Sequence, residues 1–278
     1  MTARRSLSFE IFRHVVLMLG AVIVLAPFVW LLSLSAKPAD EIFTTDIRLL
    51  PEKWDIERNF TQAFAKVPLH RYLLNGVVVT AAIFTLQVLV ALPAAYALAK
   101  LRFGLAKPLF ALVLLGLLIP GHVPAIPHYI MLSSAGLLNS YPALVLPSVI
   151  SVFGIFWIRQ FFRTVPDDLI HAARLDGLSE FSIVWRIMLP AAAPALVAFG
   201  ILSVVFHWNE YFWPLLVVTS TDMAMPALGT VYLRNTEAGT DYGPLMAGTA
   251  IITAPLVIAF LLAQRRFIEG MTLTGLKG

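Results

Sequence analysis

The sequence PDDLIHAARLDGLSEFSIVWRIMLP, residues 166–190, is a polar segment between two long apolar segments. Two aspartates follow the break at Pro166, where a helix N-terminus favours negative charge, and apolar and polar residues then alternate at helical spacing as far as Asp176. Gly177 predicts the end of this helix, because glycine adopts the left-handed C-terminal cap without steric cost. The segment therefore predicts a short helix, a glycine turn and a second helix.

The second helix of this segment is expected to begin after Ser179, whose hydroxyl can cap it. Helical spacing then predicts one apolar face made of Phe181, Val184, Trp185 and Met188. Since the flanking segments are apolar, the loop is where the chain can meet a soluble partner. An amphipathic helix lying on the membrane surface is the alternative interpretation.

The composition is that of an integral membrane protein: 59% of the 278 residues are hydrophobic and 13% are charged. The mean hydropathy is +0.83. The net charge of +4 comes from basic residues beside apolar runs and not from a patch, so no nucleic-acid partner is predicted. The chain contains no Cys, which excludes disulfides, thiolate metal sites and cysteine nucleophiles.

Apolar segments predict an all-α polytopic membrane protein with about six transmembrane helices. They cover residues 14–35, 72–99, 108–132, 141–162, 190–218 and 245–263. A signal peptide is the rival interpretation of the first segment, but its apolar region is too long. The expected layout is a cytoplasmic N-terminal arm (residues 1–13), a transmembrane domain (14–263) that contains the loop 166–190, and a cytoplasmic C-terminal tail (264–278).

The distribution of Lys and Arg predicts that both termini are cytoplasmic. The six spans place 13 of the 20 basic residues inside, which agrees with the positive-inside rule. Most of the others lie in the loop 36–71, which carries six acidic and six basic residues. This balance gives no field that would steer a substrate, so a packed extracytoplasmic cap is expected.

The third apolar segment is expected to be broken. Pro120, Gly121, Pro124 and Pro127 interrupt the backbone hydrogen bonds of a helix, and a broken helix inside a bundle usually lines a cavity. Nearby His122 and His128 have a spacing that is poor for a metal site, so no metal site is predicted and the histidines are interpreted as satisfied polar groups.

Glu210 is the one acidic residue well inside a predicted span. Ionisable residues within the membrane are usually functional, so a functional role is predicted for Glu210. With Trp208, Asn209 and Tyr211 it offers the amide and aromatic groups that contact sugars, which makes these four residues candidates for a substrate path. The alternative is an interhelical hydrogen-bond cluster. Both Glu210 and the 120–127 break lie in the outer halves of their spans, so they can face one cavity.

The loop also carries a family resemblance. Its A-A-x-x-D-G pattern, followed by Leu-Pro at 189–190, resembles the EAA loop of bacterial ABC-importer permeases. Further matches are A-A-Y-A-L-A-K-L-R-F (94–103), G-L-L-N-S (136–140), R-Q-F-F (159–162), W-N-E-Y (208–211) and the ending from residue 264. Together they are similar to the second permease of carbohydrate ABC importers, the subfamily that includes maltose and glycerol-3-phosphate systems.

The resemblance implies that the short helix before Gly177 is the coupling helix, which docks on a cytoplasmic ATPase. The ATPase-coupling residues would be Leu169, His171, Ala172, Ala173, Asp176 and Gly177. His171 departs from the family pattern, which usually has Glu there. The ending implies tail contacts to the ATPase by Gly270, Thr272, Gly275 and Lys277. A disordered solvated tail is the alternative.

The chain has no P-loop, because none of its Lys residues is followed by Ser or Thr. It is therefore expected to be no enzyme and to bind no cofactor, with ATP and Mg²⁺ on a separate ATPase. The resemblance implies a homologous second permease, two ATPase subunits and an extracytoplasmic sugar-binding protein as partners, besides membrane lipid.

The resemblance thus implies a multi-pass protein of the bacterial inner membrane that forms the path of an imported sugar or sugar derivative. A proton-coupled secondary transporter of a small polar solute is the alternative, but it would be expected to carry a relay of intramembrane ionisable residues. A membrane hydrolase would need a nucleophile elbow or H-E-x-x-H motif, and the chain has neither.

Overall fold

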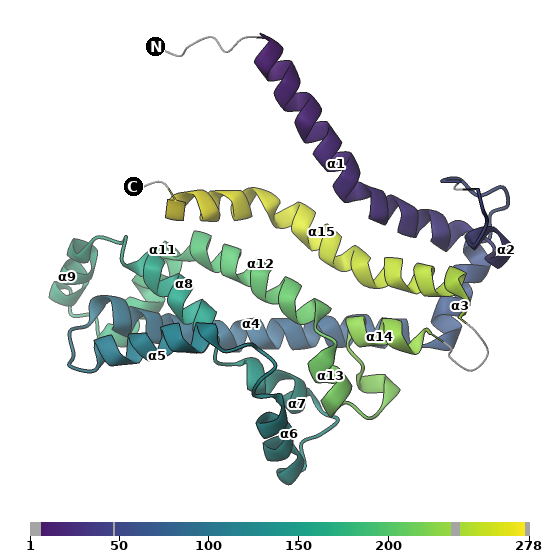
Figure 1. Cartoon of the computed structure of the whole chain (residues 1–278). Coiled ribbons are helices and arrows are strands. Elements are labelled where there is room, and N and C mark those ends of the chain that lie inside the picture. Colours follow the sequence, from purple (N-terminus) through teal and green to yellow (C-terminus); the bar gives the residue numbers. More distant parts are fainter. Residues whose placement is uncertain (1–6, 47, 235–239, 276–278) are drawn as a thin grey trace. The chain divides into compact units, whose positions relative to one another are not determined.

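The computed structural model describes residues 7–46, 48–234 and 240–275, with side chains through Gln264. Every regular element in these residues is a helix, which confirms the all-α class (Figure 1). The chain forms two compact units. The smaller comprises residues 1–67 and 230–253, and the larger comprises residues 68–229 and 254–278.

The smaller unit begins with three helices, and the N-terminal part of the last helix of the chain belongs to it. Its elements are α1 (Leu7–Ala36), α2 (Ala39–Ile42), α3 (Ile56–Lys66) and α15 (Tyr242–Gly275) as far as Thr253. α15 does not end at Ala263, where the sequence predicted the last span to end, but continues to Gly275.

The larger unit is built around α4, against which α5, α8 and α12 pack. The last helix of this unit, α14, runs three residues past the boundary of the unit. The elements are α4 (Leu69–Lys100), α5 (Ala106–Leu118), α6 (Ala125–Ser134), α7 (Tyr141–Val145), η1 (Leu146–Ser148), α8 (Val152–Phe162), α9 (Asp167–Leu175), α10 (Glu180–Ile183), η2 (Val184–Met188), α11 (Leu189–Ala191), α12 (Ala193–Asn209), α13 (Phe212–Val217), η3 (Thr221–Met223) and α14 (Pro226–Tyr232).

Three of the predicted spans are long continuous apolar helices: α1, α4 and Tyr242–Gln264 of α15. The fourth predicted span is bent by 46° between Tyr141–Ser148 and Val152–Phe162. The fifth starts at a 79° bend between Glu180–Ala191 and Ala193–Asn209, so most of the helical segment before this bend lies in the predicted loop. The third predicted span is split into α5 and α6. α5 has 13 residues, so at about 1.5 Å per residue it is shorter than a bilayer core of about 30 Å.

Small residues let the helices of the larger unit approach closely, as is common in membrane bundles. A side chain at Gly154 in α8 would place its Cβ 2.6 Å from the ring of Phe199 in α12, and one at Gly200 would come within 2.9 Å of Phe84 in α4. The two phenylalanine rings lie 6.0 Å apart. The breaks described below are therefore held by a tightly packed frame.

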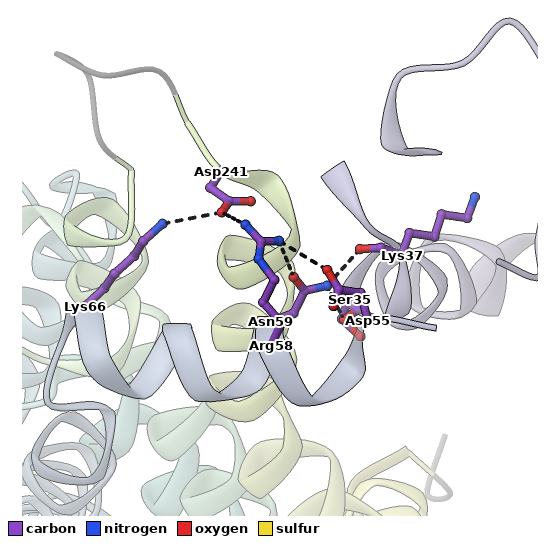
Figure 2. Close-up of polar contacts among 7 residues, drawn as sticks. All are labelled: Ser35, Lys37, Asp55, Arg58, Asn59, Lys66 and Asp241. Carbon is purple, nitrogen blue, oxygen red and sulfur yellow. Dashed lines mark hydrogen bonds and ion pairs between the residues drawn. The ribbon is translucent and has the colours of Figure 1, made fainter. Parts of the chain in front are cut away.

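Polar side chains of α3 connect the parts of the smaller unit (Figure 2). Asn59 is fully buried, and its amide nitrogen donates hydrogen bonds to the carbonyl oxygens of Ser35 (3.1 Å) and Lys37 (2.8 Å) at the end of α1. The guanidinium of Arg58 lies 2.8 Å from the carboxylate of Asp241. Within the 36–71 loop, α3 is therefore packed, whereas Leu50 and Trp54 are 72% and 64% exposed. The extracytoplasmic location of the loop stays a prediction.

Asn59→Ala is expected to lower the thermal unfolding midpoint of the detergent-solubilised protein. The change leaves two buried carbonyl oxygens without a donor, and each such loss costs about 1 to 3 kcal/mol. Thr61→Ala, at an exposed position of the same helix, is the control. An unchanged midpoint for Asn59→Ala would contradict a structural role of this side chain.

Candidate functional site

The predicted turn of the 166–190 loop has the geometry of a glycine-terminated helix end. α9 stops at Leu175, and Gly177 has a φ of +80°. Its N–H donates to the carbonyl of Arg174 (3.0 Å), and the N–H of Leu178 donates to the carbonyl of Ala173 (3.0 Å). This pair of bonds is the Schellman motif, which uses the carbonyls left free at a helix end. The predicted role of Gly177 in the turn is confirmed.

The second helix starts as predicted but does not continue as predicted. The Ser179 hydroxyl accepts the N–H of Ser182 (3.3 Å) and caps α10. Residues 184–188 then form one turn of π-helix, in which the hydrogen bonds span five residues instead of four. The single apolar face expected from α-helical spacing is therefore wrong: Val184 and Met188 are buried, whereas Phe181 is 70% exposed.

α9 has one buried face and one exposed face. Ile170 and Ala173 belong to the hydrophobic core of the larger unit, so this face is covered by protein and is not available to lipid. On the opposite side Leu175 is 89% exposed, and Leu169, which flanks the buried face, is 50% exposed. Of the candidate coupling residues, Ala173 is buried, and the exposed ones are Leu169, His171, Ala172, Asp176 and Gly177.

Two polar ties fasten the ends of α9 to the C-terminal end of α4. At the start of α9 the ammonium of Lys100 donates to the Asp167 carboxylate (2.5 Å). At its end the Glu180 carboxylate accepts a bond from the Arg174 guanidinium (2.7 Å) and one from the Tyr96 hydroxyl (2.5 Å). We call these contacts the α4 ties. Because they connect α9 directly to α4, a displacement of α9 would also displace α4.

The α4 ties also set the charge states at this surface. The hydrogen bond from Lys100 holds the pKa of the Asp167 carboxyl below its usual range, and the bonds from Arg174 and then Tyr96 lower the pKa of Glu180. Both carboxylates are therefore ionised at neutral pH. None of Tyr96, Lys100, Arg174 and Glu180 was predicted from the sequence as a site residue.

His171 lies beside a small pocket at the α9 end of α4. The pocket has a volume of about 510 Å³, and its polar lining residues are Lys100, Arg102, Asp167, His171 and Arg174. Most of these side chains are basic. The surface around His171 would therefore attract acidic groups, a property that a Glu at this position would weaken.

The predicted break in the third span exists, since α5 ends at Leu118 and α6 begins at Ala125. Gly121, His122 and Pro124 of this break line a cavity of about 660 Å³, and so do His128 and Glu210. The structure thus brings together the break and the intramembrane acid, which the sequence placed at similar depth. We call this space the central cavity.

Glu210 itself lies at a break and not within a continuous helix. α12 ends at Asn209, and Glu210 has extended backbone angles, φ −70° and ψ 120°. Its Oε1 accepts the N–H groups of Phe212 (2.8 Å) and Trp213 (3.2 Å) at the start of α13. The carboxylate therefore stabilises the first turn of α13 while the residue also lines the cavity.

The other three residues of the W-N-E-Y motif are not among the residues that line the central cavity. Trp208 is buried close to Gly76, where an added Cβ would lie 3.0 Å from the indole ring. Asn209 donates to the carbonyl of Val205 (2.8 Å), and Tyr211 is 50% exposed. For Trp208 and Asn209 these positions favour the structural alternative.

The central cavity contains polar side chains that the sequence analysis did not single out. The hydroxyl of Ser203 donates to the Gln87 carbonyl oxygen (2.7 Å), and the Gln87 amide nitrogen donates to the backbone carbonyl of Ser148 (2.8 Å). The same amide nitrogen lies 3.3 Å from Nε2 of His207. These groups come from α4, η1 and α12, far apart in the sequence.

Residues 87–272 match the family described as the binding-protein-dependent transport system inner membrane component. The chain belongs to this family. The match includes both the 166–190 loop and the cavity residues, so the resemblance found in the sequence is confirmed. As a member, the chain is a multi-pass inner-membrane permease component, and ABC import is supported over secondary transport.

Two named relatives extend the similarity over nearly the whole chain. The arabinooligosaccharides transport system permease protein AraQ of Halalkalibacterium halodurans is 34% identical over 93% of both chains. The sn-glycerol-3-phosphate transport system permease protein UgpE of Yersinia pestis is 31% identical over 94% of this chain and 95% of its own.

The fold agrees with the family assignment. A chain from the crystal structure of a bacterial ABC transporter involved in the import of the acidic polysaccharide alginate superposes with a TM-score of 0.82 at 22% identity. The superposition covers 96% of this chain and 100% of the other. It shows that the broken helices belong to an ABC-importer permease fold.

Proposed function

We propose that the chain is a permease subunit of an ATP-driven importer and that it forms part of the path for a sugar or sugar derivative. The observation that carries this proposal is the exposed surface of α9, where Leu169 and Leu175 are exposed on a helix fixed by Gly177 and the α4 ties. These leucines offer an apolar surface on which a partner protein can dock. The names of the relatives support a sugar or polyol derivative as the solute.

The importer would contain four further proteins besides this chain. They are a homologous permease, two copies of an ATPase that holds ATP and Mg²⁺, and an extracytoplasmic binding protein that delivers the solute. This chain would not hydrolyse ATP, since it has no P-loop. Closure of the ATPase dimer would displace α9, and the α4 ties would pass the displacement to the helices around the central cavity.

The test is to purify the affinity-tagged chain from its native membrane and to reconstitute the purified complex with its binding protein into proteoliposomes. We expect an ATPase to co-purify, and solute uptake to require Mg-ATP and to resist a protonophore. Uptake that proceeds without ATP and collapses with the proton gradient would overturn the proposal in favour of a secondary transporter.

Both termini and the α9 loop are proposed to be cytoplasmic, which thiol labelling in intact cells can test. The chain has no native Cys, so Ala106→Cys, Ser179→Cys and Thr45→Cys each provide a single target. An impermeant thiol reagent is expected to label position 45 only, and permeabilised cells should also become labelled at positions 106 and 179. Labelling of position 106 or 179 from outside would reverse the topology.

The predicted tail contacts Gly270, Thr272 and Gly275 lie beyond the described side chains, and Lys277 lies outside the described residues altogether. Their contact with the ATPase stays a prediction from the resemblance.

A further inference from the structure

The central cavity lies where three interruptions of the helices meet in the larger unit. They are the α5–α6 break, the bend before α8 and the α12–α13 break at Glu210. Irregular backbone at membrane depth is tolerated where it lines a cavity, since water or solute can then bond the backbone groups. With a volume of about 660 Å³, the cavity has the size of a small-molecule site.

The lining of the central cavity carries little charge. Among the residues that the structure describes, none of those lining it is Lys or Arg, and Glu210 is its one acidic residue. The Glu210 carboxylate is held in place by two backbone N–H groups of α13. A phosphate or carboxylate in this space would meet the Glu210 carboxylate and no Lys or Arg, which is unfavourable at low dielectric.

The uncharged groups of the central cavity are held in fixed positions. Gln87 is bonded by Ser203 and by the backbone at Ser148, and it lies against His207. The ring of His128 lies 6.1 Å from that of Trp213. Amide, hydroxyl and imidazole groups both donate and accept hydrogen bonds, as hydroxyl groups of a solute require, and flat aromatic faces suit the apolar face of a sugar ring.

We propose that the central cavity is a substrate subsite for an uncharged, hydroxyl-rich solute such as a neutral saccharide, and that it disfavours sugar phosphates and uronates. The proposal rests on the proposed function, and it assigns direct solute contact to this permease. Glu210 sets the charge preference, while the Gln87 amide and the His207 ring supply hydrogen-bonding groups.

The charge preference can be measured without knowing the solute. Ile150 lines the cavity and is 69% exposed, so Ile150→Cys provides a single thiol there in a chain that has no other Cys. The probes are methanethiosulfonate reagents that carry either an ammonium or a sulfonate group, applied to the detergent-solubilised complex. The ratio of their reaction rates at Thr45→Cys, an exposed position in the α2–α3 loop, corrects for intrinsic reactivity.

The corrected ratio is expected to favour the cationic reagent by at least about tenfold at Ile150→Cys, a factor that one nearby charge can supply. Addition of Glu210→Gln, which keeps an oxygen acceptor for the α13 amides, should reduce the ratio to about one. Three results at Ile150→Cys with Glu210 intact would overturn the proposal: equal corrected rates for the two reagents, faster reaction of the anionic reagent, or no reaction with either.

Transport by the reconstituted complex separates this proposal from the proposed function. In a panel of neutral saccharides, glycerol 3-phosphate and galacturonate, every solute taken up with ATP is expected to be uncharged. ATP-dependent uptake of either anion would overturn the charge preference and leave the importer function intact. If no solute is taken up with ATP, the proposed function fails, and the thiol measurement still decides the character of the cavity.

Discussion

Gly177→Val is expected to reduce solute transport by at least about tenfold while the permease still inserts and accumulates in the membrane. The residue has a φ of +80°, and a β-branched side chain in this region costs about 1 to 3 kcal/mol. Relief of this strain would break the two Schellman hydrogen bonds and let α9 leave its position. The measurement is uptake per assembled complex in proteoliposomes.

Two control variants separate backbone strain from the mere presence of a side chain at position 177. No atom lies within 4 Å of a Cβ built on Gly177, so the expected defect comes from the backbone conformation. Gly177→Asn should therefore retain most transport, because Asn tolerates positive φ. Gly104→Val, in the loop before α5 where a Cβ also meets no atom, should be neutral. Full transport by Gly177→Val would show that the turn is not needed for coupling.

Leu175→Asp is expected to reduce the amount of ATPase that co-purifies with the permease by about 10- to 100-fold. Burial of a leucine in an interface contributes about 1.5 to 3 kcal/mol, which corresponds to this range of affinity. Since Leu175 is 89% exposed in the isolated chain, its replacement should leave the fold and the yield of permease unchanged.

The matched control for Leu175→Asp is Leu105→Asp. Leu105 is 65% exposed in the loop before α5, outside the proposed docking surface, so this change should retain the ATPase. Equal ATPase retention by the two variants would mean that α9 does not dock the ATPase.

Local chemistry made the turn of the 166–190 loop predictable. A glycine between two helical patterns and a serine one turn before an apolar run constrain the backbone through their own side chains, so Gly177 and Ser179 could be assigned from the sequence. The breaks in the third span were equally local, because proline removes a donor wherever it occurs. The helices beside the third-span break follow from apolar composition, and the helix before Gly177 follows from its spacing of apolar and polar residues.

The α4 ties and the polar lining of the cavity were not predictable in this way. Tyr96 and Glu180 are 84 residues apart, and Gln87 and His207 are 120 residues apart. No local pattern marks such pairs, because the packing of α4 against α12 and against η2, which follows α10, brings them together. The π-helical turn at 184–188 has the same origin: its α-helical propensity is ordinary, and the structure alone shows the changed hydrogen bonds.

Glu210 illustrates a site residue that the sequence selected with the wrong local structure. The sequence indicated an acid inside a continuous span, and the structure places it at the end of α12, where it caps α13 and lines the cavity. The outcome for the W-N-E-Y motif therefore differs by residue, since its neighbours Trp208 and Asn209 do not line the cavity.

The central claim, that α9 contacts the ATPase, is tested most directly by cross-linking. Ala172 is exposed on α9, so Ala172→Cys presents a single thiol at the proposed interface. A short thiol-to-amine cross-linker added to the purified complex is expected to join the permease to the ATPase at position 172 and not at position 45, where Thr45→Cys serves as control. Cross-linking to the ATPase from position 45, or its absence at position 172 in a complex that retains the ATPase, would contradict the account.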